Sequence, residues 1–454
     1  MLQRFVQPQN FVTTSKGVLL GVLVSCSMAA HAMDFLQAYQ AAQKEDATLL
    51  AARAMLESER ERLPQARALM LPNISANLAS SKNKLTSESP DFLGTMQTYH
   101  TDYPSSNKTV TLRQPIYRPL LTAQFRQAKA LINDAESGLA LEEQNLAVRV
   151  SSAYFDALLS SDQLSMIQAQ KRTYTTQLDA ATKAFAAGSG VRTDIDEAKA
   201  KLDMNFADEL EAKQNVAYTF QNLQTLINQP FDNLAGLDLA KFKPTTPDPE
   251  SLAEWKARAE LTSPQIQSLK ARVEAAREEI AKAKSGHYPT LDAIAQWSDS
   301  NSESVTNIQS RYINSTIGLQ LNIPLYSGGY INSQIRQAQA ELIRAEENLE
   351  FGRRDLGLRV FKEFRGVTEN IPKVAALEQA LRSADQMILS SRKSFEAGSR
   401  TILDVMNAEQ QRMVVLRDLA QARYMYILSK LRLLALVGSA DTEAVIAVNS
   451  VFSN

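Results

Sequence analysis

Apolar side chains recur at helical spacing over most of this 454-residue chain, and the longest such stretch runs from Pro119 to Ala187. Within it Gly138 is the only glycine, and no further proline occurs. Alternating steps of four and three residues separate its first apolar positions, Leu121, Phe125, Ala128, Ile132, Ala135 and Leu139. Such heptad spacing is typical of helices packed as a coiled coil. The stretch predicts one unbroken helix of about 100 Å, at roughly 1.5 Å per residue.

Two shorter segments, residues 34–69 and 251–285, are also predicted to be helices. Both are rich in Ala, Glu, Arg and Leu and lack glycine, and Pro64 and Pro264 are their only prolines. Proline is tolerated near helix ends and disturbs a helix interior. We therefore expect two helices with perturbed ends, each of which precedes a strand.

Four segments have the composition of strands: residues 73–82, 107–117, 290–298 and 312–324. In the last one, apolar and polar residues alternate from Tyr312 to Pro324, which predicts a strand with one apolar and one polar face. Its length suits a strand that crosses a membrane, although a sheet in a soluble protein would show the same alternation. The polar segments Lys82–Ser106 and Asp299–Arg311 are predicted to be exposed loops at the outer face.

The chain contains an internal duplication. Phe185–Ser189 recurs as Phe395–Ser399, an offset of 210 residues (395 minus 185). Gln124–Ala130 recurs as Gln334–Ala340 at the same offset (334 minus 124). Two separate matches at one offset indicate that each half contains the same elements in the same order.

The repeat divides the chain into five parts. Residues 1–32 resemble a secretory signal peptide, with Arg4 and Lys16 before a short apolar run and Ala30–Ala32 as an A-x-A cleavage pattern. We expect a first repeat over 33–229, a linker over 230–250, a second repeat over 251–437 and a tail over 438–454. The linker and the tail are expected to be irregular or weakly structured.

Cys26 is the only cysteine. It follows Leu23-Val24-Ser25 in a pattern that resembles a lipobox, so lipidation of Cys26 and cleavage after Ala32 both remain open. Either way, no disulfide is expected in the exported protein.

Composition and charge exclude several classes of function. The formal net charge is -1, and no basic stripe suggests binding to nucleic acid. Only three histidines occur, and no metalloprotease, esterase or P-loop motif is present. We expect no enzymatic activity, no metal site and no cofactor.

The two turns at Phe185–Ala198 and Phe395–Ala408, together with Gln114–Tyr117 and Ile323–Gly329, resemble the TolC family of outer-membrane channel-tunnels. This resemblance covers the whole mature chain. It implies a mainly helical fold with a small β part, in which three copies share a 12-stranded membrane barrel on a helical periplasmic tunnel. Four strands alone cannot close a barrel, and open strand edges are not tolerated in lipid, so sharing of this kind is required in a membrane.

The resemblance also implies roles for residues at the periplasmic tip. Asp404 would form an acidic constriction with its symmetry copies, and Asn407, one turn away, would form a neutral second ring where some members have an acid. Arg400 would link to Thr193 and Asp194 and hold the tip closed. The turns at Gly188, Ser189, Gly398 and Ser399 would dock a periplasmic adaptor.

Simpler structural roles compete with these assignments. Thr401-x-x-Asp404 and Thr193-x-x-Asp196 both fit a capping motif, so Asp404 could serve only as a helix cap. Gly188 and Gly398 are predicted to be the residues with positive φ that end each long helix.

The function expected from the resemblance is a passive exit duct in the outer membrane, embedded in lipid and used for type I protein secretion or drug efflux. Its partners would be two further copies, a periplasmic adaptor and an inner-membrane ABC or other export pump. A periplasmic or surface coiled-coil scaffold without channel activity is the alternative.

Overall fold

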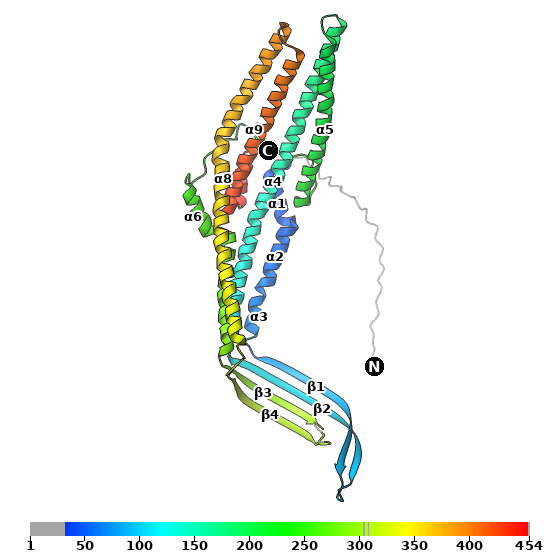
Figure 1. The fold of residues 1–454 in the computed structure, drawn as a ribbon, viewed down its shortest axis with the longest axis vertical. Helices are drawn as coiled ribbons and strands as arrows, with labels where there is room; N and C mark the ends of the chain where they lie inside the picture. Colours follow the sequence, from blue (N-terminus) through cyan, green and yellow to red (C-terminus); the bar gives the residue numbers. More distant parts are fainter. Residues whose placement is uncertain (1–31, 303–304, 307, 453–454) are drawn as a thin grey trace, which may run out of the picture.

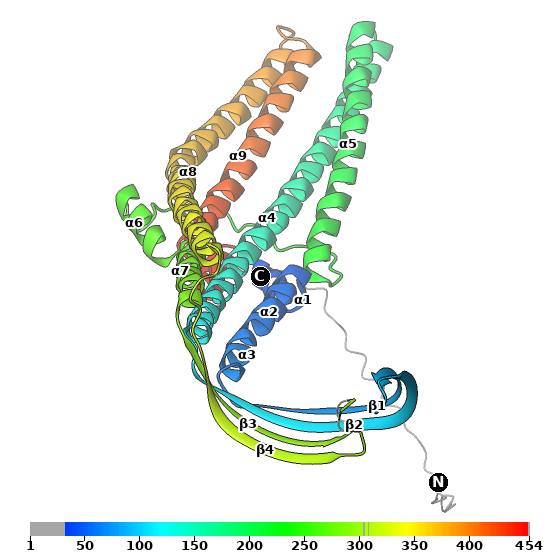
Figure 2. The same ribbon diagram turned by 60° about the horizontal axis from the view of Figure 1, so that its bottom comes forward.

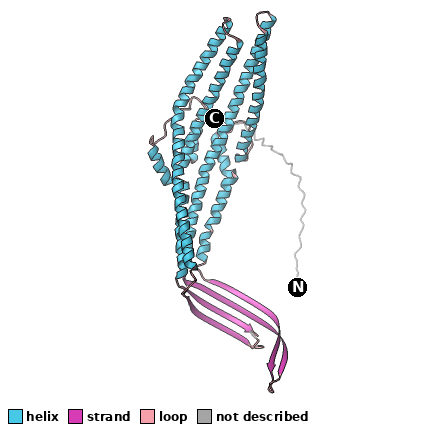
Figure 3. Cartoon of the chain, in the orientation of Figure 1, coloured by secondary structure: helices cyan, strands magenta, loops and turns pink. Residues whose placement is uncertain are grey.

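The computed structural model describes residues 32–302, 305–306 and 308–452, and it is a long bundle of helices with a sheet at one end (Figure 1). Helices make up most of the chain, and all strands lie together beyond the end of the bundle (Figure 3). The predicted fold class, mainly helical with a small β part, is confirmed.

Two very long helices extend from the sheet to the far end of the molecule. They are α4 (Pro119–Ala186) and α8 (Tyr330–Glu396), and each returns through a shorter helix, α5 (Arg192–Ile227) and α9 (Ile402–Leu436). The unbroken helix predicted from Pro119 is confirmed over 68 residues. The α4–α5 and α8–α9 hairpins have their turns at the same end of the molecule (Figure 1).

The segments predicted as single short helices are each broken. The first contains α1 (Phe35–Glu45), α2 (Ala47–Arg60) and α3 (Arg62–Ala68), and the second contains α6 (Leu252–Thr262), α7 (Pro264–Lys284) and the turn η1 (Ser285–His287). The breaks at Asp46 and Ser263 both have extended ψ angles, of 115° and 123°. They lie 217 residues apart (263 minus 46), so the break itself belongs to the duplicated unit.

The strands form one antiparallel sheet in the order β1-β2-β3-β4: β1 (Asn73–Pro90), β2 (Met96–Tyr117), β3 (Thr290–Asn301) and β4 (Arg311–Asn322). The predicted loop Lys82–Ser106 is wrong, because β1 and β2 remain paired until Pro90 lies opposite Met96. This distal part is polar on both faces, so it lacks the alternation that predicts a strand, yet its backbone groups pair across the hairpin.

The alternation predicted for the last strand is confirmed for β4. Ile313, Ile317 and Leu319 lie on one face, and Tyr312, Asn314 and Thr316 lie on the other. The register aligns these faces across the sheet, since Ala76, Val110, Trp297 and Ser315 form one row. The sheet is strongly curved, and the end of the β1–β2 hairpin bends further (Figure 2).

The main core lies midway along the bundle and joins the two ends of the described chain. Phe35 is fully buried against Tyr154 and Phe155, with ring centroids 5.5 Å from each. Phe452 stacks on Phe155 at 5.9 Å. The expectation of a weakly structured tail is wrong, because residues Thr442–Asn449 form helix α10, which packs near α1.

Candidate functional site

The turns at the ends of the two hairpins have the same backbone geometry. Gly188 and Gly398 both have φ of 73°, which confirms the prediction that they adopt the left-handed conformation after each long helix. In the first turn Gly188 N donates to Phe185 O and Ser189 N donates to Ala184 O. The second turn repeats this pattern through Gly398 and Ser399, so both helices end in a Schellman motif.

Asp404 is both a helix cap and an exposed carboxylate. Thr401 N donates to Asp404 Oδ2 at 2.9 Å, and Asp404 N donates back to Thr401 Oγ1 at 3.3 Å, so the capping box forms. The hydrogen bond from the Thr401 backbone lowers the pKa of Asp404. Asp404 and Asn407 are both exposed and lie on one face of α9.

The second predicted capping motif does not form. α5 begins at Arg192 with Val191 as its cap residue, so Thr193 already lies inside the helix. Asp196 instead accepts a hydrogen bond from Arg192 Nε at 3.3 Å.

Arg400 lies at the tip of the α8–α9 hairpin, and its Nη1 donates to Ser391 Oγ at 2.9 Å. Thr193 and Asp194 lie in the first turn of α5, at the tip of the other hairpin. Within the described part of this single chain, no hydrogen bond or ion pair joins Arg400 to either residue.

Two buried carboxylates that were not identified from the sequence hold the helices together near the tips. Glu409 accepts from Gln177 Nε2 at 2.9 Å and from Arg392 Nη2 at 2.7 Å, so it connects α9 to α4 and α8. Glu209 accepts from Lys171 at 2.6 Å and pairs with Lys213 at 2.7 Å. These hydrogen bonds lower the pKa of Glu209 to about 2.

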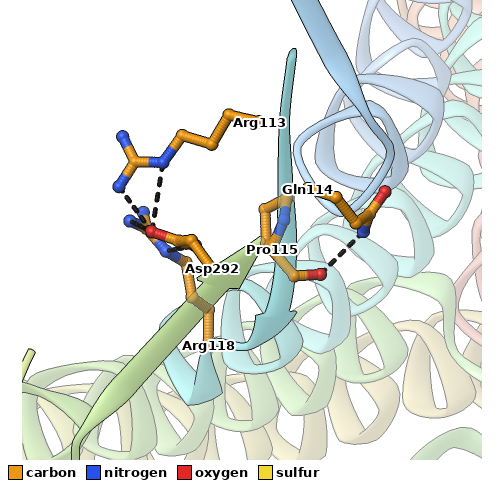
Figure 4. A network of polar contacts seen from close by, with 5 residues as sticks. All are labelled: Arg113, Gln114, Pro115, Arg118 and Asp292. Atoms are coloured by element: carbon orange, nitrogen blue, oxygen red, sulfur yellow. Dashed lines mark hydrogen bonds and ion pairs between the residues drawn. The ribbon is translucent and has the colours of Figure 1, made fainter. Parts of the chain in front are cut away.

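A third buried carboxylate fixes the sheet to the helices. Asp292 on β3 is 2% exposed and binds two arginines from the other repeat: Arg113 Nη2 at 2.5 Å and Arg118 Nη2 at 2.7 Å (Figure 4). Arg113 belongs to β2, and Arg118 directly precedes α4. Beside them Gln114 Nε2 donates to Pro115 O and to Met70 O. The cluster therefore joins both repeats where the strands lead into the helices.

Among the residues that the structure describes, no helix is both long and apolar enough to cross a bilayer.

Within the same described ranges, no three His, Cys, Asp or Glu side chains gather in a way that could hold a metal ion.

The outward and inward faces of the sheet differ in chemistry. One face of β4 is apolar and exposed from Ile313 to Leu321, and its other face is polar without charge. A surface of this kind lets one side contact lipid while the other contacts water.

Comparison with known proteins identifies the family. The family model described as outer membrane efflux protein matches residues 38–229 and 255–439. The chain is 31% identical to the alkaline protease secretion protein AprF of Pseudomonas aeruginosa, over 92% of this chain and 88% of that protein. It is 29% identical to the proteases secretion protein PrtF of Dickeya chrysanthemi, over 94% and 93% of the two chains.

A solved structure shares this fold. The outer membrane protein VceC of Vibrio cholerae aligns with a TM-score of 0.75 at 16% identity, over 90% of this chain and 97% of that chain. The chain belongs to the outer membrane efflux protein family, and it is an export channel of the bacterial outer membrane whose helical part lies in the periplasm.

Proposed function

We propose that three copies of this chain form the outer-membrane exit duct of a type I protein secretion system. A periplasmic adaptor and an inner-membrane ABC pump would complete the system and supply the energy. Two relatives that match over most of their length are named as protease secretion proteins, which favours protein export over drug efflux.

The observation that carries this proposal is the open sheet. Its order β1-β2-β3-β4 leaves β1 and β4 as edges, although the outer face of β4 is apolar. An edge strand in lipid leaves backbone groups without hydrogen-bond partners, which costs several kcal/mol per group. Pairing of β4 with β1 of the next copy removes both edges when three copies close a ring.

The gate of this duct is assigned to the periplasmic tip. Arg400 would contact Thr193 and Asp194 of a neighbouring copy, since a guanidinium group has five N–H donors and Ser391 accepts from one nitrogen. Threefold symmetry would place Asp404 and Asn407 in stacked rings, and an acidic ring favours cations in a narrow pore.

The adaptor would dock at the turns that contain Gly188, Ser189, Gly398 and Ser399. All four residues are exposed, and both turns share one Schellman geometry. Two copies of the turn per chain would give six similar docking edges in a trimer.

The test combines assembly with conductance. We expect outer-membrane fractions to contain trimers that dissociate only on heating, and the purified trimer to conduct ions in planar bilayers. Arg400→Ala should raise conductance several-fold, whereas Arg417→Ala in the adjoining helix α9, where Arg417 pairs with Asp418, should not. A monomeric soluble product without conductance would indicate the coiled-coil scaffold instead.

A deletion strain distinguishes the two export roles. For type I secretion, we expect a protein to disappear from the culture medium while susceptibility to drugs stays unchanged. The reverse pattern would assign the duct to drug efflux.

A further inference from the structure

The outward face of the sheet is the face that contains the apolar residues of β4. On this face, charged side chains occur only towards the end of the sheet that is farthest from the helices. On β3 the outward residues next to the helices are uncharged, and the first outward charge is Asp299. The uncharged residues are Leu291, Ala293, Ala295 and Trp297. The same holds for the other three described strands, whose first outward charges are Lys82, Lys108 and Arg311. We call Lys82, Lys108, Asp299 and Arg311 the outer-rim cluster.

The register brings the outer-rim cluster together. Lys108 on β2 lies opposite Asp299 on β3. Arg311 on β4 lies opposite Asn301, which is two residues beyond Asp299 along β3. Lys82 lies opposite Pro104, beyond both. The cluster therefore spans all four strands of the sheet.

The position of the cluster matches the outer boundary of the membrane. Asp299 lies eight residues beyond Leu291 (299 minus 291), which is about 20 Å along the membrane normal for strands tilted by roughly 40°. The apolar band of such proteins is about 25 Å tall. Trp297 is 41% exposed just below the cluster, where aromatic residues are enriched at a membrane interface.

The cluster has a surplus of positive charge. Arg311 binds Asp299 through two hydrogen bonds of 2.7 and 2.8 Å, and the Arg311 side chain remains 64% exposed. Lys82 and Lys108 are exposed and form no ion pair within the described part of the chain. Lys84, further out, lies opposite Asp102, which offsets its charge. Three cations and one carboxylate leave a net charge of +2.

We propose that the outer-rim cluster binds the phosphate groups of an outer-leaflet glycolipid headgroup, of the lipid A class. Phosphate is recognised by ammonium groups and by the exposed edge of a guanidinium. The apolar side chains directly below, Val110, Trp297 and Ile313, would contact the acyl chains of the same lipid.

The first test measures binding of lipid A that carries both phosphates to the purified trimer by native mass spectrometry. Each basic residue near an anionic lipid contributes roughly fivefold to affinity, so the triple variant K82Q/K108Q/R311Q should bind about 100-fold more weakly. Dephosphorylated lipid A should bind the variant and the native protein equally. Equal loss for both lipids, or no loss for either, would overturn the proposal.

A second variant controls for loss of binding caused by a disrupted sheet. Asp299→Asn removes the one acid of the cluster and leaves every cation in place, so affinity for lipid A should rise about fivefold. Lys393→Gln, a matched change in the periplasmic α8, should alter nothing. A loss of affinity in Asp299→Asn, or an equal effect of Lys393→Gln, would contradict the assignment.

Inorganic phosphate separates a lipid site from a site for free anions. We expect a millimolar excess of inorganic phosphate to displace little lipid A, because free phosphate lacks the acyl contacts. Complete displacement would identify a free-phosphate site and overturn the lipid assignment. Conductance of the variants should equal that of the native trimer, so failure here would not bear on the export function.

Discussion

At the scale of single residues, the two hairpin tips differ at equivalent positions. The offset of 210 residues places Val191 opposite Thr401 and Asp194 opposite Asp404 (401 minus 191, 404 minus 194). Thr401 supplies the hydroxyl group of a capping box, and Val191 has none. Asp194 is therefore not held in a capping box, which fits its proposed role as an acceptor for Arg400 of a neighbouring copy.

The lowered pKa of Asp404 leads to a prediction about selectivity. In the folded state the carboxylate stays ionised below its ordinary range, so cation preference should persist at pH 7 and disappear only as pH falls through the lowered pKa. Asp404→Asn should abolish the preference at pH 7, as measured by reversal potentials in planar bilayers.

Thr401→Val is the matched control for this prediction. It removes the cap hydroxyl, which costs about 1 kcal/mol of helix stability, and keeps the carboxylate. Cation preference should therefore survive at pH 7. If Asp404→Asn lowers only thermal stability and leaves the reversal potential unchanged, Asp404 is a cap and not a pore residue.

Local residue interactions could be predicted from the sequence, and distant ones could not. The Thr401–Asp404 box and the tip glycines depend on neighbours within five positions, so a motif identifies them. Glu209 and Asp292 take partners 38 and 179 positions away. No motif marks such a pair, because the register of packed helices and strands brings the partners together.

Glu209 gives a second residue-scale prediction. Because its pKa is lowered to about 2, its stabilising effect is complete above the ordinary glutamate pKa and is lost as pH falls towards 2. Glu209→Gln should therefore lower thermal stability at pH 7 and leave it nearly unchanged at pH 2. Circular dichroism melts at both pH values measure this.

Glu211→Gln provides the comparison for Glu209, because Glu211 is exposed on the same helix and forms no ion pair in the described structure. Its melts should match the native protein at both pH values. An equal drop in melting temperature for both variants would show that the contacts of Glu209 with Lys171 and Lys213 do not account for its effect on stability.

At the scale of elements, the sequence predicted helices better than strands. Heptad spacing continues through α4, so the helix was found with its end one residue from the observed end. β1 and β2 were found only where one face is apolar, from Asn73 to Lys82 and from Asn107 to Tyr117. Outside the membrane both faces of the β1–β2 hairpin contact water. Its side chains therefore lack the apolar and polar alternation that would predict the strand pairing.

The Schellman turns allow a prediction with opposite signs at two glycines. Gly398→Ala places a Cβ on a residue with φ of 73°, which should destabilise the tip by about 1 kcal/mol. Gly357→Ala lies in the middle of α8 with open space around the added Cβ, so it should stabilise the helix by up to about 1 kcal/mol.

Hydrogen exchange followed by mass spectrometry measures both effects locally. Amides of residues 394–404 should exchange about fivefold faster in Gly398→Ala, since 1 kcal/mol corresponds to roughly that factor. Amides around Gly357 should exchange at the native rate or more slowly in its variant. Faster exchange at both sites would mean that the left-handed turn is not the cause.

At the scale of the whole molecule, the number of strands could be predicted from the sequence, and the need for several copies followed from that number. The trimer could not be deduced from one chain's periodicity, because the contacts that close the ring lie between copies. The repeated sequences of the two turns reveal the duplication. No sequence pattern predicts the aromatic cluster that joins Phe35 to Phe452. That cluster arises only when both repeats fold together.

The orientation of the molecule gives the last prediction. Phe92 lies fully exposed in the turn between β1 and β2, and Ser189 lies in the turn between α4 and α5. These two turns are at opposite ends of the molecule (Figure 1). Because Cys26 is the only native cysteine and lies in the segment expected to be cleaved, the mature protein provides a clean background. Phe92→Cys should react in intact cells with a maleimide that cannot cross membranes. Ser189→Cys should react only after the outer membrane is permeabilised, and the opposite result would invert the assigned orientation.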